Sequence, residues 1–204
     1  MNRLLAPIAA TSLIAFAIAG VALASNPPAV SPAAPRAAAY TVDGGHSSVV
    51  FKIKHQNVAN FYGRFNDVSG TFHLDAAAPE AGSIDITVKA DSVDSASSKR
   101  DQHLKSADFF SVKEFPEITF KSTGIKKAAD GTFDVTGDLA FRGVTKSITA
   151  KVADTGTGEG RGGSKVAGIE ATFIIQRSEF GMNFMPGGLG EDVSLIVALE
   201  GGLK

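Results

Sequence analysis

The feature of this sequence that most constrains its fold is an alternation of apolar and polar residues along most of the chain after Tyr40. In the segment 83–90, for example, Ile84, Ile86 and Val88 alternate with polar residues. A β-strand places successive side chains on opposite faces, so this pattern predicts strands with one buried face and one solvent-exposed face. The clearest segments are 83–90, 132–141, 169–175 and 193–199, and the weaker ones are 49–54, 65–72, 118–120 and 147–152.

These segments predict about eight strands, mostly separated by turn residues such as Asp130-Gly131. The chain lacks the regular strand–helix–strand spacing of a parallel sheet. We therefore expect an antiparallel sheet that closes into a barrel or folds into a sandwich. Between Phe65 and Phe72 the apolar positions slip by one residue, which predicts a bulge or bend near Ser69-Gly70.

The segment 97–110 interrupts the alternation. Ser97 and Ser98 are both suitable N-caps, and good helix formers follow them. We expect a short helix over one end of the sheet, with Leu104 directed inward and Phe109 and Phe110 after it. Such a helix either plugs the barrel or acts as a lid, and both interpretations stay open.

The first 24 residues have the layout of a secretory signal peptide. Arg3 precedes a long apolar stretch, and Ala22-Leu23-Ala24 supplies the small residues that a signal peptidase recognises. The alternative is an uncleaved membrane anchor, because about 20 apolar residues can span a bilayer. The Ala-x-Ala ending favours cleavage, so we expect residues 1–24 to be a signal peptide for export.

Composition limits the rest of the chain. Residues 25–39 are rich in Pro and Ala and predict a linker outside the fold, which leaves 40–204 as one domain. The absence of cysteine excludes disulfides and thiolate metal sites. With a net charge of −1 and no basic run longer than Lys126-Lys127, nucleic acid is not an expected partner.

The polar residues show no recognisable catalytic or metal-binding motif. The four histidines, His46, His55, His73 and His103, do not occur at metal-ligand spacings, so we expect neither a metal nor another cofactor. The sequence has no Gly-x-Ser-x-Gly element, and the adjacent His46 and Ser47 do not by themselves form a nucleophile–base pair. We therefore expect no catalytic residues and a protein that is not an enzyme.

Phenylalanine dominates the predicted inward faces. The chain has 14 Phe, 2 Tyr and no Trp. An eight-stranded barrel has an interior that side chains can fill or that can hold one small ligand. Ala90, Gly137, Ala150 and Ala171 share the inward face and would leave room for a ligand if they cluster. A packed core and a ligand cavity both remain open on this reasoning.

A series of short motifs runs through the whole domain. They are Val42-Asp43-Gly44-Gly45-His46-Ser47, Val49-x-Phe51-x-Ile53-x-His55, Arg100-Asp101-x-His103-Leu104-x-Ser106-x-Asp108-Phe109-Phe110, Phe115-Pro116-x-Ile118-x-Phe120-x-Ser122, Gly137-Asp138-Leu139, Gly143-Val144-Thr145-Lys146 and Arg177-Ser178-x-Phe180-Gly181. In this combination and order they resemble the YceI-like family of lipocalin-like, polyisoprenoid-binding proteins. Glu179 and Ala140 differ from the Asp and Thr that are usual in that family.

The resemblance implies an all-β fold, namely an eight-stranded antiparallel lipocalin-like barrel with a short helix covering one end. It also implies a long apolar pocket for an isoprenoid chain and a periplasmic location, which agrees with the predicted export signal. The ligand-binding residues expected on this basis are Phe51, Ile53, Phe72, His103, Phe109, Phe110, Phe120, Phe133, Phe141, Phe173, Ile175 and Arg177.

Arg177 has two interpretations. Alternation places it on the same inward face as Phe173 and Ile175. Its guanidinium is therefore predicted to be partly buried and to need a partner. The interpretation that we favour is a structural salt bridge to an acidic residue such as Asp101 or Asp108. The alternative is recognition of a phosphate or another polar lipid head group.

We therefore expect a periplasmic binding or carrier protein for a polyisoprenoid, a quinone-like lipid or a similar long apolar lipid. Two alternatives are an enzyme that acts on an isoprenoid or quinone-type lipid and a packed-core interaction module. The carrier hypothesis implies transient contact with a membrane, and an exposed strand edge would allow a homodimer.

Overall fold

The computed structural model describes residues 39–203. The strands are β1 Tyr40–Val42, β2 Ser48–His55, β3 Ala59–Phe65, β4 Val68–His73, β5 Ser83–Lys89, β6 Val93–Asp94, β7 Glu117–Lys127, β8 Phe133–Phe141, β9 Val144–Glu159, β10 Lys165–Gln176 and β11 Leu189–Leu203. The helix α1 spans Ser98–Leu104, and the short 3-10 turns are η1 Pro79–Ala81, η2 Ala90–Ser92, η3 Arg161–Gly163 and η4 Arg177–Phe180. Within 39–203, no helix is long and apolar enough to cross a membrane.

Two predicted segments fall outside this range. The predicted signal peptide, 1–24, lies wholly outside the described residues, and so does the predicted linker, 25–39, apart from its last residue.

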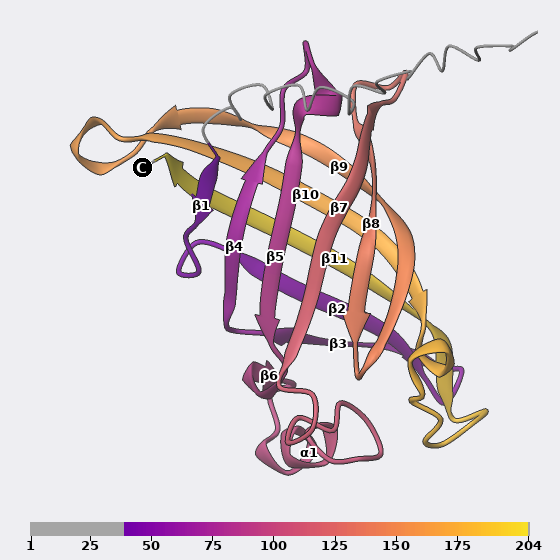
Figure 1. The fold of residues 1–204 in the computed structure, drawn as a ribbon. Helices are drawn as coiled ribbons and strands as arrows, with labels where there is room; N and C mark the ends of the chain where they lie inside the picture. The colour runs from indigo at the N-terminus through magenta and orange to yellow at the C-terminus, as the bar shows by residue number, and fades with distance from the viewer. Residues whose placement is uncertain (1–38, 204) are drawn as a thin grey trace, which may run out of the picture. The chain divides into compact units, whose positions relative to one another are not determined.

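The strands form one antiparallel sheet that closes into a barrel (Figure 1). Eight strands make the ring, in the order β1–β4–β5–β7–β8–β9–β10–β11, and β11 pairs back onto β1. β2, β3 and β6 continue the sheet from β11 in that order. The predicted all-β antiparallel barrel is thus confirmed.

The C-terminal strand β11 joins the two parts of the sheet. The pairs Val193–Ile53 and Val197–Val49 attach its first half to β2, and its last three residues pair with β1. β10 pairs along its other edge. Because β1 and β2 follow each other through the turn 43–47, they lie end to end along one edge of β11.

The alternating residues face inward as predicted. In β8, Phe133, Val135, Gly137, Leu139 and Phe141 are all buried, and the residues that alternate with them are exposed or half-buried. The small inward residues differ in what they do. Ala150 and Ala171 line a cavity, and Ala90 is buried in η2 without lining it.

Gly137 makes room for a neighbouring side chain. A Cβ at this position would lie 2.5 Å from Cζ of Phe120 and 2.5 Å from the carbonyl oxygen of Lys121. The ring of Phe120 therefore occupies the space that a side chain at position 137 would need. This glycine supports a packed wall and leaves no room for a ligand.

The strand β3 is not among the predicted strands. Its inward residues are Phe61, Gly63 and Phe65, whereas the outward Tyr62 has 56% of its surface exposed. A glycine on the buried face and a tyrosine on the exposed face obscure the alternation. Gly63 lies opposite Phe51 on β2, and the Phe51 ring covers the position of the missing side chain.

The break in apolar phase lies at Asn66-Asp67, between β3 and β4, and the predicted position near Ser69-Gly70 is wrong. Phe65 and Val68 are both buried although they are three residues apart. The amides of residues 66 and 67 both donate to Oγ of Ser92, which fixes this corner on η2. The pairing of β4 with β5 beyond the corner is regular.

The segment 97–110 is helical only in its first half. Ser97 precedes α1 with an extended backbone, as an N-cap residue does, and turns replace the helix after Leu104. The helix and these turns lie over one end of the barrel (Figure 1), which confirms the predicted covering helix.

We expect Gly63→Ala to destabilise the protein by about 1–3 kcal/mol, because the added methyl group overlaps the Phe51 ring in a packed wall. Urea unfolding would measure this change. The matched control is Gly124→Ala in β7, where a Cβ meets no atom within 4 Å and where we expect a change within about 0.5 kcal/mol. Equal stabilities for the two variants would contradict the close contact between Phe51 and Gly63.

Candidate functional site

The barrel encloses a cavity of about 440 Å³. Eight strands, β2, β3, β5, β7, β8, β9, β10 and β11, contribute inward side chains to its wall. The segment from α1 to Phe110 and the loop between η4 and β11 line its end. Its volume falls within the range of about 300–1,000 Å³ that is common for small-molecule sites.

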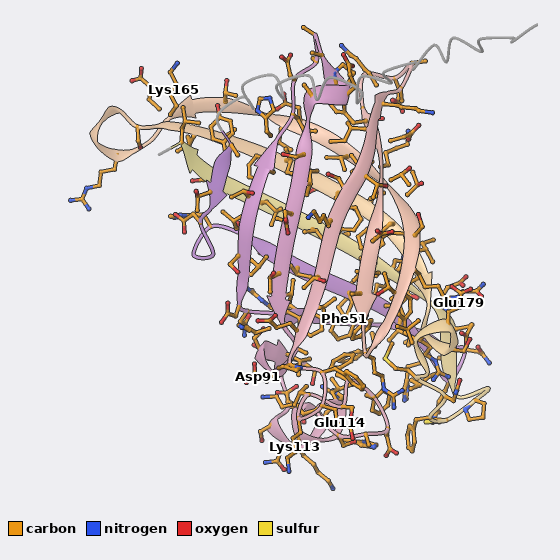
Figure 2. All side chains as sticks on the ribbon, viewed as in Figure 1. Phe51, Asp91, Lys113, Glu114, Lys165 and Glu179 are labelled. Carbon is orange, nitrogen blue, oxygen red and sulfur yellow. The ribbon has the colours of Figure 1, made fainter. Side chains whose placement is uncertain are left out.

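Ten of the twelve predicted ligand-binding residues line this cavity. They are Phe51, Ile53, His103, Phe109, Phe110, Phe120, Phe141, Phe173, Ile175 and Arg177. Figure 2 shows Phe51 within the lower part of the barrel, towards α1.

Phe72 and Phe133 are buried but do not line the cavity. They lie where β4 ends and β8 begins, at the end of the barrel away from α1 (Figure 1). There the rings pack against other core side chains, as Phe72 does in stacking on Tyr40 with ring centroids 5.7 Å apart. Alternation predicts which face a residue occupies but not its height along the barrel, so it does not separate the filled end from the hollow end.

The polar part of the lining is small and consists mostly of arginine and histidine. Apart from His55, Arg100, His103, Thr119 and Arg177, every lining side chain is apolar. No carboxylate occurs among the described residues that line the cavity. The two arginines and two histidines come from α1, η4 and the end of β2, so these polar groups are concentrated at one end.

Arg100 attaches α1 to the barrel. Its Nε donates to Oγ of Ser95 (2.9 Å), and its guanidinium carbon lies 4.4 Å from the centre of the Phe61 ring on β3. Asp101 accepts hydrogen bonds from the amide (2.8 Å) and hydroxyl (2.5 Å) of the same serine. These contacts fix the start of the helix over the rim of β3.

Aromatic contacts hold the chain that follows α1. The ring of Phe110 lies 5.4 Å from Phe65 and 5.7 Å from Phe141, which places it inside the barrel end. Phe109, His103 and Phe184 form a second cluster with centroid distances of 4.9–5.3 Å. This second cluster joins the α1 segment to the loop before β11.

Arg142 adds a polar link between the same two segments. Its Nη1 donates to the carbonyl of Gly181 (2.9 Å), and its Nη2 donates to the carbonyl of Ala107 (2.7 Å). The cover of the cavity is therefore attached by both aromatic packing and hydrogen bonds.

Arg177 is 4% exposed, and backbone carbonyls surround it. Its Nε donates to Gly190 (2.9 Å), and its Nη1 donates to Met182 (2.6 Å) and Phe184 (2.8 Å). The predicted salt bridge to Asp101 or Asp108 is wrong, because Asp101 bonds Ser95 and Asp108 bonds His103. The carbonyl oxygens of a folded-back loop stabilise the guanidinium in place of a carboxylate.

Sequence reasoning missed the loop that Arg177 organises. Met182, Phe184 and Met185 from this loop line the cavity, as does Leu189 at the start of β11. The run 181–190 contains four glycines and has no regular period, so hydrophobic alternation does not identify its apolar residues as lining.

The adjacent His46 and Ser47 do not form a nucleophile–base pair. Nδ1 of His46 lies 2.9 Å from Oδ2 of Asp43, and the hydroxyl of Ser47 donates to the carbonyl of Asp43 (2.7 Å). Ser47 is buried, with 7% of its surface exposed, and its oxygen also accepts from the amide of Glu200 (3.1 Å). Its hydroxyl thus has a structural role in the turn.

Comparison with known proteins agrees with this architecture. The family model of the YceI-like domain matches residues 40–201. The chain belongs to the YceI-like family. The UPF0312 protein of Azotobacter vinelandii and protein YceI of Salmonella newport are each 40% identical to it over 167 residues, which are 81% of this chain and 87% of each relative.

Solved structures of similar proteins share the fold. The YceI protein of Campylobacter jejuni is 31% identical, with a TM-score of 0.63, over 81% of this chain and 98% of that chain. BcnA of Burkholderia cenocepacia is 24% identical with a TM-score of 0.72, covering 78% of this chain and 98% of that chain. A polyisoprenoid-binding domain of Saccharophagus degradans is 15% identical with a TM-score of 0.63, covering 82% of this chain and 99% of that domain. The last two show likeness of fold alone.

We expect Arg177→Ala to destabilise the YceI-like domain by about 2–5 kcal/mol, because it leaves several buried carbonyl oxygens without a donor. Arg177→Lys should also be destabilising, because an ammonium group cannot reproduce the planar arrangement of N–H donors in a guanidinium. Chemical unfolding would test both, with the exposed Arg161→Ala as the control. If Arg177→Ala were as stable as the control, the carbonyl contacts would not be the reason for its burial.

Proposed function

We propose that this protein binds and carries a single long apolar lipid of the polyisoprenoid or quinone-like class, and that it does not catalyse a reaction. The observation that carries the proposal is the apolar cavity of about 440 Å³. The proposal is supported by one protein of the same fold, the polyisoprenoid-binding domain of Saccharophagus degradans. We further propose that the carrier works in the periplasm and contacts a membrane transiently to load its ligand.

The energetics of the cavity favour an occupant. The cavity of about 440 Å³ is lined almost entirely by apolar side chains, so water that fills it finds few hydrogen-bond partners. A lipid chain that fills the cavity gains contact with the rings of the wall and loses its own exposure to water. The cavity therefore favours a lipid carrier over a packed-core interaction module.

The lining also favours binding over catalysis. Of the arginines and histidines along the wall, Arg177 already donates to carbonyls, and Nε2 of His103 is hydrogen-bonded to Asp108. No acidic side chain of the described wall is positioned to accept a proton from a bound lipid. An enzyme that acts on an isoprenoid or quinone would need a convergent set of such groups.

The polar head of the ligand is proposed to face α1. Arg100 uses Nε and Nη2 to bond Ser95, and its Nη1 makes no hydrogen bond within residues 39–203. Arg177, by contrast, is occupied by carbonyls. Arg100 is therefore a better candidate than Arg177 for contact with an anionic head group.

The first test is native mass spectrometry of the purified protein, followed by organic extraction and identification of the lipid. We expect one apolar molecule per chain. Ala171→Phe should lose most of this ligand, because the added ring enters the cavity from β10. Because the ring enters unfilled space, we do not expect it to lower the stability of the fold by the roughly 1–3 kcal/mol that is typical of overpacking in filled cores.

Thr172→Phe is the matched control, since Thr172 is the next residue of β10 and faces solvent. The control should keep the ligand. A chain that stays free of lipid after incubation with polyprenyl phosphates and quinones would contradict the proposal. So would equal ligand contents in the two variants.

Arg100→Gln tests the position of the head group. We expect the share of anionic lipids in the extract to fall relative to neutral lipids, because the charge at the α1 end is lost. The control is Arg64→Gln, which removes an exposed arginine from the outward face of neighbouring β3. An unchanged lipid composition in Arg100→Gln would place the head group elsewhere.

A further inference from the structure

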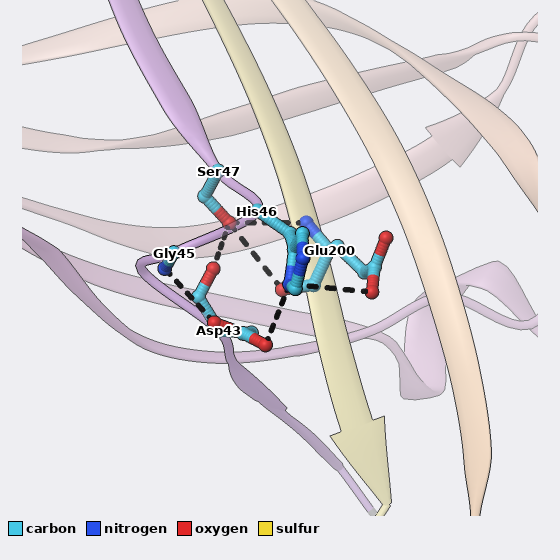
Figure 3. Close-up of polar contacts among 5 residues, drawn as sticks. All are labelled: Asp43, Gly45, His46, Ser47 and Glu200. Atoms are coloured by element: carbon cyan, nitrogen blue, oxygen red, sulfur yellow. Dashed lines mark hydrogen bonds and ion pairs between the residues drawn. The ribbon is translucent and has the colours of Figure 1, made fainter. Parts of the chain in front are cut away.

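A polar cluster lies on the outer surface where the β1–β2 turn meets β11 (Figure 3). Asp43 and His46 come from the turn, and Glu200 comes from β11. Nδ1 of His46 lies 2.9 Å from Oδ2 of Asp43 and 4.0 Å from Oε1 of Glu200. None of the three residues lines the lipid cavity.

The backbone beneath the cluster is held by several hydrogen bonds. The amide of Asp43 donates to the carbonyl of Glu200 (2.8 Å), and the amide of Glu200 donates to Oγ of Ser47 (3.1 Å). The amide of His46 donates to the carbonyl of Asp43 (3.1 Å). These bonds join the turn to β11, so the three side chains start from fixed positions although Asp43 and Glu200 are 157 residues apart in the sequence.

The carboxylate of Asp43 is also held in one orientation. Its Oδ1 accepts a hydrogen bond from the amide of Gly45 (2.8 Å), which turns Oδ2 towards His46 (Figure 3). A hydrogen-bonded carboxylate that presents its second oxygen is typical of the supporting contacts around metal ligands. The side chains remain 69%, 51% and 47% exposed for His46, Asp43 and Glu200, so an ion from solvent can reach them.

We propose that His46, Asp43 and Glu200 form a surface site for one divalent zinc ion, with solvent completing the coordination. One imidazole nitrogen and two carboxylate oxygens are a ligand set that zinc accepts, and three protein ligands leave one position for water. Two ligands of a tetrahedral zinc ion lie about 3.4 Å apart, given bonds of about 2.0–2.1 Å. The distances of 2.9 and 4.0 Å from Nδ1 lie on either side of this value. All three candidate ligand atoms lie within 4.8 Å of one another, so side-chain rotation alone can complete the site.

Zinc and protons compete for the same nitrogen. The hydrogen bond to Asp43 raises the pKa of His46, with the charges of Asp43 and Glu200 adding to this, and the same contact with His46 lowers the pKa of Asp43. Metal binding replaces the proton on Nδ1, which is released to solvent. Zinc affinity should therefore be lower at acidic pH, where protons compete with the metal for Nδ1.

The test is isothermal titration calorimetry, in which zinc chloride is added to the purified, untagged protein at pH 7.5 and at pH 5.5. A polyhistidine tag must be absent because it would bind the metal itself. We expect one zinc ion per chain at pH 7.5 and weaker binding at pH 5.5. His46→Ala and Glu200→Gln should each weaken binding by more than about tenfold.

The matched control is Glu170→Gln, an exposed carboxylate on the adjacent strand β10 that is not part of the cluster. It should bind zinc as the unaltered protein does. Absence of saturable binding would overturn the proposal, as would equal affinities in His46→Ala and the control. An unchanged affinity in Glu200→Gln would overturn the three-ligand site. Because the three residues lie outside the cavity, each outcome is independent of whether the lipid proposal succeeds.

Discussion

The double pairing of β11 is the interaction on which the rest of the structure depends. One edge of this strand pairs with β10, and the other edge pairs first with β2 and then with β1. The contact with β1 closes the ring, so the sheet has no free edge at that point. The backbone groups of the wall satisfy one another, and the inward side chains can therefore be almost entirely apolar.

Closure alone would allow a filled interior, and the two ends of this barrel differ in how they are filled. At the end away from α1, rings such as Phe72 and Phe133 pack among other core side chains. Ala150 and Ala171 are small residues of the cavity wall, and at the α1 end the cover is supplied by irregular chain that extends from the strands. Between the filled end and this cover, the inward side chains leave a cavity of about 440 Å³.

The arginines near the cavity contribute mainly to its construction. Arg142 and Arg177 donate to carbonyls of the irregular segments, where the backbone has no strand partner. A planar guanidinium can serve several carbonyls at once, which makes it suited to holding a loop in a fixed shape. In the proposed carrier function, discrimination among ligands is left to chain length and to the few groups at the α1 end, chiefly Arg100 and His103.

Local sequence determined the strands, their buried faces and the start of α1, because these depend on the period of the side chains and on capping. The same reasoning failed at β3, where Gly63 faces inward and Tyr62 outward, and at Arg177, whose partners are carbonyls of a loop without a period. Only the tertiary structure decided which inward rings line the cavity, because the alternation of side chains does not specify a residue's position along the barrel axis. It also decided that Glu200 meets His46, because the pairing of β11 with β1 and β2 brings together residues that no local pattern relates.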